Sequence, residues 1–195
     1  MNRFVLDKEA ILQAAENAIR RYGPGKTNLT DIAKALSVSH AAIYRYYADK
    51  ADLLEAVTER WLARTFRSLD PIMRENARPE EKLRHYLQEL CRTKRTCAAT
   101  DPEMFENYSV LSEGSSRALN EHLHHILNQM ESIIQQGIRS KVFVDQDPRQ
   151  LAVSAFIATS RFHHPAFASE WQNPDIENQL DAVLNLILSG MEVRS

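Results

Sequence analysis

Residues 28–50 read NLTDIAKALSVSHAAIYRYYADK, and this stretch decides the fold of the chain. Asn28 stands where it can cap a helix, and Leu29 and Ile32 begin an apolar face at helical spacing. The sequence SVS at 37–39 then interrupts the apolar pattern before a second helix. Two short helices joined by a tight turn predict a helix-turn-helix.

The second helix of this pair has an outer face suited to a DNA groove. Ser39 is placed to cap the helix, and Ile43 and Tyr47 lie four residues apart, so both point inward. The helix begins with the small pair Ala41 and Ala42. Small side chains let the backbone approach base edges, and the second helix of a helix-turn-helix enters the major groove.

This stretch resembles the DNA-binding domain of the Tet repressor (TetR) family, whose pattern is IA, a turn, VS, a small pair, YRYF and then K. The matching residues are Ile32-Ala33, Val38-Ser39, Ala41-Ala42, Tyr44-Arg45-Tyr46-Tyr47 and Lys50. Two positions depart from the pattern, because Ser37 and Ala41 stand where the family usually has glycine. We expect Ser37 to adopt a left-handed backbone at modest cost.

The resemblance implies binding to double-stranded DNA at a palindromic operator, and the residues divide into two groups. The start of the first helix, Tyr44 and Lys50 are expected to contact phosphates, while the start of the second helix faces base edges and Arg45 lies at the rim of the groove. Lys50 follows Asp49, which can cap the next helix, so a cation and free backbone N–H groups share one spot. The expected DNA-binding residues are Asn28, Thr30, Ser39, His40, Ala41, Ala42, Tyr44, Arg45 and Lys50.

The composition agrees with a helical, DNA-binding protein. Only five glycines and seven prolines in 195 residues favour long helices, and a hydrophobic content of 44% is ample for a core. Residues 1–50 hold eight Lys or Arg and five acids, a charge of +3, so a net charge of −2 leaves −5 for the remainder. A locally basic module on an acidic body suits phosphate contact by one part of the chain.

The sequence also bears on location and on the cysteines. No run of about 18 apolar residues predicts a transmembrane span, and residues 1–21 lack the apolar core of a signal peptide, so we expect a cytoplasmic protein. Cys91 and Cys97 are six positions apart on a predicted helix and face different directions. We expect two free, buried thiols, with a redox sensor as the alternative.

Caps and prolines mark the starts of the other helices, since Asp-Pro and Asn-Pro pairs place a cap before a first helical position. The expected starts are Asp7, Asp49, Pro79, Pro102, Ser115 or Ser116, Pro148 and Pro174. The predicted fold is all-α, with a helix-turn-helix DNA-binding domain over residues 1–48 and a larger helical domain over residues 49–195. The resemblance assigns ligand binding and dimerisation to the larger domain.

The last two predicted helices carry wide apolar stripes. The resemblance implies that they pair with their twofold mates as a four-helix bundle in a homodimer, and a helix-turn-helix that reads palindromic DNA needs two copies. The expected interface residues are Phe156, Val183, Leu184 and Ile187. The alternative is that both helices are buried within one subunit.

Aromatic and methionine side chains gather in the middle of the chain, at Tyr86, Met104, Phe105, Tyr108 and Met130. Each of them suits a core, and as a group they also suit a cavity between helices. The resemblance implies a small-molecule effector at such a cavity. Because no cluster of charges accompanies these residues, we expect an apolar or aromatic effector.

Other chemistry finds little support in the sequence. His122 and His125 share a helical face and His163-His164 occurs elsewhere, but no HExxH or CxxC pattern is present, so we expect no metal site. The five glycines form no phosphate-binding loop and no catalytic motif is visible, so we expect neither an enzyme nor a cofactor.

These observations together predict a ligand-responsive transcriptional repressor, released from its operator by a small effector. Two alternatives stay open. One is a DNA-binding regulator without a small-molecule ligand, and the other is a metal- or redox-sensing helical regulator.

Overall fold

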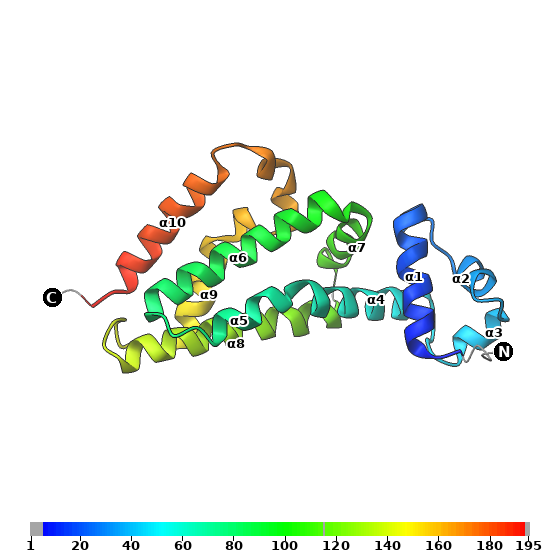
Figure 1. Ribbon diagram of the computed structural model, residues 1–195, viewed down its shortest axis with the longest axis horizontal. Helices are drawn as coiled ribbons and strands as arrows, with labels where there is room; N and C mark the ends of the chain where they lie inside the picture. Colours follow the sequence, from blue (N-terminus) through cyan, green and yellow to red (C-terminus); the bar gives the residue numbers. More distant parts are fainter. Residues whose placement is uncertain (1–5, 115, 194–195) are drawn as a thin grey trace. The chain divides into compact units, whose positions relative to one another are not determined.

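The computed structural model describes residues 6–114 and 116–193. These residues form helices joined by turns, and they include no β-strand (Figure 1). The chain divides into two compact units. The first comprises Met1–Arg64 and Cys97–Asn120, and the second comprises Thr65–Thr96 and Glu121–Ser195. The predicted fold, all-α with an N-terminal helix-turn-helix, is confirmed.

The first unit begins with the three short helices of the helix-turn-helix region. These are α1 (Lys8–Tyr22), α2 (Leu29–Ala35) and α3 (His40–Tyr44), followed by α4 (Lys50–Thr65) and, later in the chain, α7 (Pro102–Ser112). The carboxylate of Asp7 accepts the N–H of Ala10 at 2.8 Å and caps α1, as its position predicted. Ile11, Ala15 and Ile19 are buried and give α1 its inner face.

The turn between α2 and α3 has the backbone that the sequence predicted. Ser37 has φ 54°, in the left-handed region that glycine adopts more readily. The N–H of Val38 donates to the carbonyl of Ala33 at 3.0 Å and closes the turn after α2. Asn28 caps α2 at its other end by accepting the N–H of Asp31 at 2.9 Å.

The second unit is built mainly from the long helices. Its elements, two of which also contribute residues to the first unit, are η1 (Phe66–Leu69), α5 (Asp70–Met73), α6 (Pro79–Thr100), α8 (Arg117–Arg139), α9 (Pro148–Ala158), η2 (Ser160–Phe162), η3 (Pro165–Gln172) and α10 (Ile176–Met191). Helices begin at Pro79, Pro102 and Pro148 as predicted. The hydroxyl of Ser116 accepts the N–H of Leu119 at 3.2 Å at the start of α8, while the other candidate cap, Ser115, lies outside the described residues.

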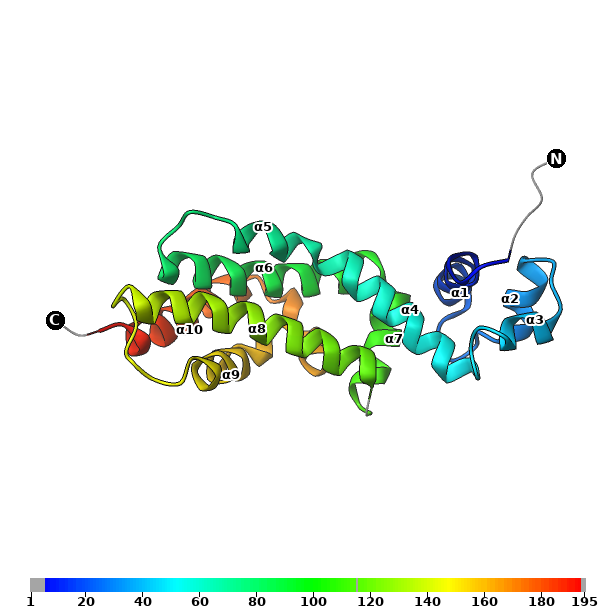
Figure 2. The same cartoon turned by 90° about the horizontal axis from the view of Figure 1, so that it is seen from below.

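Side-chain hydrogen bonds join the helices of the second unit, whose ribbons are drawn in Figure 2. They link α6 to α10 through Gln88 and Asp181 (2.8 Å), α6 to α8 through Tyr86 and Gln129 (2.8 Å), and α8 to α9 through Asn128 and Arg149 (2.8 Å). The core between these helices is apolar, with Leu83, Leu87, Leu90, Ile133, Ile134, Leu180 and Leu184 buried. The polar pairs therefore lie around an apolar interior.

Candidate DNA-binding surface and effector domain

The second helix of the helix-turn-helix, α3, is held by two buried side chains. Ile43 is 0% exposed and Tyr47, just after the helix, is 5% exposed. His40 and Tyr44 lie on the outer face, with their ring centroids 5.0 Å apart in an edge-on arrangement. The anchored inner face therefore presents the opposite face of α3 to solvent.

The cap of α3 differs from the expectation. Ser39 stands at the N-cap position, but its side chain makes no capping hydrogen bond. The hydroxyl therefore does not satisfy the first N–H groups of this helix, and the side chain is exposed. A phosphate oxygen at this point would find both a hydroxyl and helix N–H groups.

The start of α4 is capped as predicted. Asp49 accepts the N–H of Asp52 at 2.8 Å, and Asp52 in turn accepts the N–H of Ala48 at 2.9 Å. The ammonium of Lys50 donates to the carbonyl of Gly25 at 3.3 Å, which holds the cation beside the loop between α1 and α2. Lys50 is thus a positioned charge on this surface.

All nine residues expected to bind DNA lie in the first unit, around α2, α3 and the start of α4. Seven are exposed and two are half-buried. The exposed ones are Asn28, Thr30, Ser39, His40, Ala41, Tyr44 and Arg45, and the half-buried ones are Ala42 and Lys50. Their roles toward DNA stay predictions.

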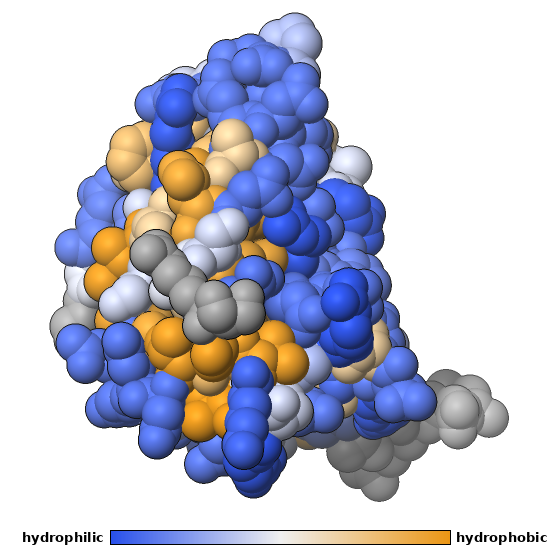
Figure 3. Space-filling view, turned by 90° about the vertical axis from the view of Figure 1, so that its left-hand side faces the viewer, coloured by the Kyte–Doolittle hydropathy of each residue, from blue (hydrophilic) through white to orange (hydrophobic). Residues whose placement is uncertain are grey.

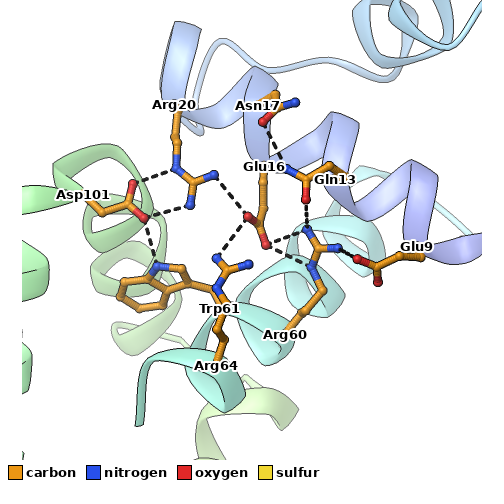
Figure 4. A network of polar contacts seen from close by, with 9 residues as sticks. All are labelled: Glu9, Gln13, Glu16, Asn17, Arg20, Arg60, Trp61, Arg64 and Asp101. Atoms are coloured by element: carbon orange, nitrogen blue, oxygen red, sulfur yellow. Dashed lines mark hydrogen bonds and ion pairs between the residues drawn. The ribbon is translucent and has the colours of Figure 1, made fainter. Parts of the chain in front are cut away.

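A buried carboxylate ties α1 to α4 within the same unit, a feature that the sequence analysis missed (Figure 4). Glu16 on α1 is 1% exposed and pairs with Arg60 at 2.7 Å and with Arg64 at 3.2 Å, both on α4, and with Arg20 at 3.1 Å. Burial alone raises the pKa of Glu16, but hydrogen bonds from Arg60 and Arg64 outweigh it and leave the pKa below its usual value. Glu16 is therefore a charged, fully paired group.

Asp101, the residue before α7, extends this network. Arg20 donates to both carboxylate oxygens of Asp101 at 2.9 Å, and the indole N–H of Trp61 donates to the same group at 3.1 Å. Both pairs appear in Figure 4. Side chains from α1 and α4 thus bind one carboxylate at the start of α7. A movement of α7 or α4 would therefore displace the side chains of α1 that are bonded to it.

The five residues expected to bind an effector are all buried, but they belong to different units. Met104, Phe105 and Tyr108 are in the first unit, whereas Tyr86 and Met130 are in the second. The hydroxyl of Tyr86 donates to Gln129, whose amide donates to Asp70 at 3.2 Å. Burial raises the pKa of Tyr86, so this hydroxyl stays protonated. The assignment of these residues to an effector site stays a prediction.

The residues expected at a dimer interface require one correction. Leu184 is 0% exposed, so it packs in the core of its own chain and cannot face a partner. Val183 and Ile187 on α10 and Phe156 on α9 are half-buried, while Leu186 is 76% exposed and Ile157 is 63% exposed. Figure 3 shows apolar side chains gathered on the face of the second unit that is turned toward the viewer. The outward side of α10 is therefore the side that carries Leu186.

The cysteines and histidines were the residues considered for a redox or metal sensor. Neither Cys91 nor Cys97 is in a disulfide and both are buried, as expected, and burial raises the pKa of Cys91 to about 12, which keeps it a thiol. Among the described residues, no group of three or more His, Cys, Asp and Glu side chains is placed to hold a metal ion. Within the same residues, no helix has the length and apolar character needed to cross a membrane.

The chain matches known proteins along most of its length. It is 23% identical to the Fatty acid metabolism regulator protein of Bacillus subtilis over 185 residues, 93% of each chain. It is 37% identical to the transcriptional regulator TtgR of Pseudomonas putida over 68 residues, 32% of each chain. The solved structure of FadR from Bacillus subtilis in complex with stearoyl-CoA has a TM-score of 0.66 and 22% identity, covering 95% of this chain and 100% of that chain.

Two family models match separate parts of the sequence. The model described as bacterial regulatory proteins of the tetR family matches residues 11–57, which include α2 and α3. The model described as the tetracyclin repressor-like C-terminal domain matches residues 79–184. The chain belongs to the TetR family of DNA-binding transcription regulators.

Proposed function

We propose that this protein is a homodimeric transcription repressor that binds a palindromic operator and leaves it when an effector binds. The observation that carries the proposal is α3, a short helix anchored by Ile43 and Tyr47 with its outer face exposed, inside the region that the family model matches. Residues 1–48 would bind DNA, and residues 49–195 would bind the effector and dimerise. The proposal includes no enzymatic step.

The effector is proposed to be a molecule with a long apolar chain. One relative is named for fatty acid metabolism, and a solved relative holds stearoyl-CoA. Buried Tyr86 and Met130 supply aromatic and flexible apolar surface on α6 and α8, the kind of lining that suits such a chain. The sequence led us to expect an apolar or aromatic effector, and this proposal restricts that class to molecules with a long apolar chain.

The network around Glu16 and Asp101 would couple effector binding to the position of the DNA-binding helices. Asp101 directly precedes α7, and Arg20 connects it to α1, which packs beside the helix-turn-helix. An effector that binds one arrangement of α4 and α7 better than another shifts the population between the two. The spacing of the two recognition helices in the dimer would change with it.

The dimer is proposed to form through the outward sides of α9 and α10. Leu186 and Ile157 are the large apolar side chains that these helices expose most. Pairing with a second copy would remove them from water, and each buried apolar side chain contributes roughly 1.5–3 kcal/mol. Two recognition helices then reach half-sites about 34–36 Å apart.

The test is a DNA-binding comparison of matched variants. Operator fragments are first selected from genomic DNA with the purified protein, and binding is then measured at several salt concentrations. Lys50→Ala should weaken binding to all sequences and lower the salt slope by about 1. His40→Ala should change the preferred sequence, because a base contact is worth about 1–3 kcal/mol.

Arg139→Ala is the control, since Arg139 is an exposed cation at the end of α8 in the second unit. It should leave operator affinity and the salt slope unchanged. If His40→Ala keeps the same sequence preference, His40 does not face base edges. A wild-type protein that selects no DNA fragment would contradict the proposed function itself.

A further inference from the structure

A polar side chain is buried in the loop between α1 and α2. Thr27 is 1% exposed, although most threonines lie at the protein surface. Its hydroxyl donates to the carbonyl of Gly23 at 2.8 Å, and its backbone N–H donates to the same carbonyl at 3.1 Å. These two hydrogen bonds close residues 23–27 into one turn.

The backbone of this turn is also fixed at its start. Gly23 has φ 76°, which glycine adopts more readily than other residues, and its N–H donates to the carbonyl of Ile19 at 2.7 Å at the end of α1. Pro24, whose ring fixes φ, is buried beneath the turn. The exposed residue Gly25 therefore lies between two fixed points, and the direction of its carbonyl is set by the closed turn.

The carbonyl of Gly25 is the oxygen that holds Lys50. The ammonium of Lys50, at the start of α4, donates to this carbonyl at 3.3 Å. A lysine ammonium has three N–H donors, so this hydrogen bond leaves two for another acceptor. A lysine side chain loses rotational freedom when it binds a phosphate, and a side chain that the protein already holds loses less.

We propose that Thr27 is a positioning residue for DNA binding. By closing the turn, Thr27 fixes the carbonyl of Gly25, and this carbonyl holds the ammonium of Lys50 where a DNA phosphate binds. Thr27 would not contact DNA itself, because its side chain is buried. This inference rests on the proposed function, and in particular on the phosphate contact of Lys50. It adds that the loop between α1 and α2 tunes DNA affinity through a residue outside the binding surface.

The test is a double-mutant cycle in the full-length protein, with operator fragments selected by the wild type. Thr27→Val keeps the branched shape of the side chain and removes its hydroxyl. In the wild-type background it should weaken binding about two- to tenfold for each subunit bound, as expected when one held side chain becomes free before binding. In the Lys50→Ala background the same substitution should change affinity by less than about twofold, because the ammonium that the turn holds is gone.

Two further variants separate positioning from a general loss of stability. Thr27→Ser keeps the hydroxyl and should bind DNA as the wild type does. Thr159→Val is the matched control in the second unit, since Thr159 is 0% exposed and its hydroxyl donates at 2.9 Å to the carbonyl of Ala155, four residues earlier, as in the turn. It should lower the melting temperature and leave DNA affinity unchanged.

The outcomes separate this inference from the proposed function. If Thr27→Val leaves affinity unchanged in the wild-type background, or weakens binding equally in both backgrounds, the positioning role is wrong while the DNA-binding function stands. If Lys50→Ala alone leaves affinity unchanged, the phosphate contact of Lys50 fails and the inference falls with it. If Thr27→Val does not fold, Thr27→Ala takes its place in the cycle, since it also removes the hydroxyl, and the same two results would overturn the proposal.

Discussion

The two units each bury a charged side chain, and they surround it in different ways. Glu16 in the first unit is enclosed by Arg20, Arg60 and Arg64, so its carboxylate is paired on all sides. Lys94 in the second unit lies over Phe66, beside an imidazole with an unpartnered nitrogen. The first charge is held by ion pairs with three guanidinium groups, whereas the second lies over the face of an aromatic ring.

This difference marks the Glu16 network as a structural clamp. A buried ion pair whose partners are all present fixes the geometry of the helices that carry it, here α1 and α4. The comparison therefore assigns the positioning of α1 and α4 to the Glu16 network.

The largest effect is expected when a charge enters the second unit away from Lys94. Leu184 is fully buried on the inner side of α10, so Leu184→Asp places a carboxylate in an apolar core. We expect a loss of more than about 4 kcal/mol, enough to unfold a marginally stable protein. Circular dichroism during urea unfolding measures it.

Leu186→Asp is the matched control on the same helix, because Leu186 is 76% exposed. This variant should fold normally and lose only dimer stability, which light scattering records. A Leu184→Asp variant with wild-type stability would mean that the second unit tolerates buried charge in general, and the contrast drawn for Lys94 would then fail.

The next effect concerns pH. Burial lowers the pKa of His163 to about 4, below the ordinary value of about 6.5 expected in the unfolded chain. Between these values the unfolded state binds more protons, so acidification from pH 6.5 toward 4 should remove up to about 3 kcal/mol of stability. His163→Gln should flatten this dependence, as measured by urea unfolding at a series of pH values.

His164→Gln provides the comparison, since His164 is the exposed neighbour. It should leave the pH dependence as in the wild type. Equal slopes for His163→Gln and the wild type between pH 6.5 and 5 would show that His163 titrates alike in the folded and unfolded states, so that burial does not lower its pKa.

A smaller effect is expected at the clamp. Glu16→Gln keeps the shape of the side chain and removes the charge that Arg60 and Arg64 face, which should cost about 2 kcal/mol in urea unfolding. Glu9→Gln removes the exposed partner of the same Arg60 and should cost under about 0.5 kcal/mol. Equal losses in the two variants would show that burial of Glu16 adds nothing to the pair.

The fold was largely predictable because its signals are local. Asp7, Asn28 and Asp49 cap the helices they were expected to cap, and the left-handed backbone at Ser37 follows from the missing glycine. The faces of the later helices were harder to assign. A wide apolar stripe does not tell which side meets its own core, and so Leu184 was placed on the wrong side.

The polar clusters were not predicted, although one signal for them is visible afterwards. Glu16 and Lys94 stand in phase with the apolar residues of α1 and α6, at positions where a solvated side chain is not expected. His122 was considered as a metal ligand or as part of a solvated helix face. The partners of these side chains come from distant parts of the chain, and helical spacing in one segment carries no information about them.

The smallest effect tests whether close apolar packing dominates the second unit away from Lys94. A Cβ at Gly137 on α8 would lie 2.1 Å from the ring of Phe143, which is 1% exposed and cannot move without opening the core. Gly137→Ala gains about 1 kcal/mol of helix propensity but loses about 1–3 kcal/mol to overpacking, a net loss near 1 kcal/mol. Gly190→Ala on α10 meets nothing within 4 Å, so it should raise stability by up to about 1 kcal/mol. If Phe143 is fixed, thermal unfolding should show a lower melting temperature for Gly137→Ala and a higher one for Gly190→Ala. A stabilised Gly137→Ala variant would show that the ring of Phe143 can move to make room for the methyl group.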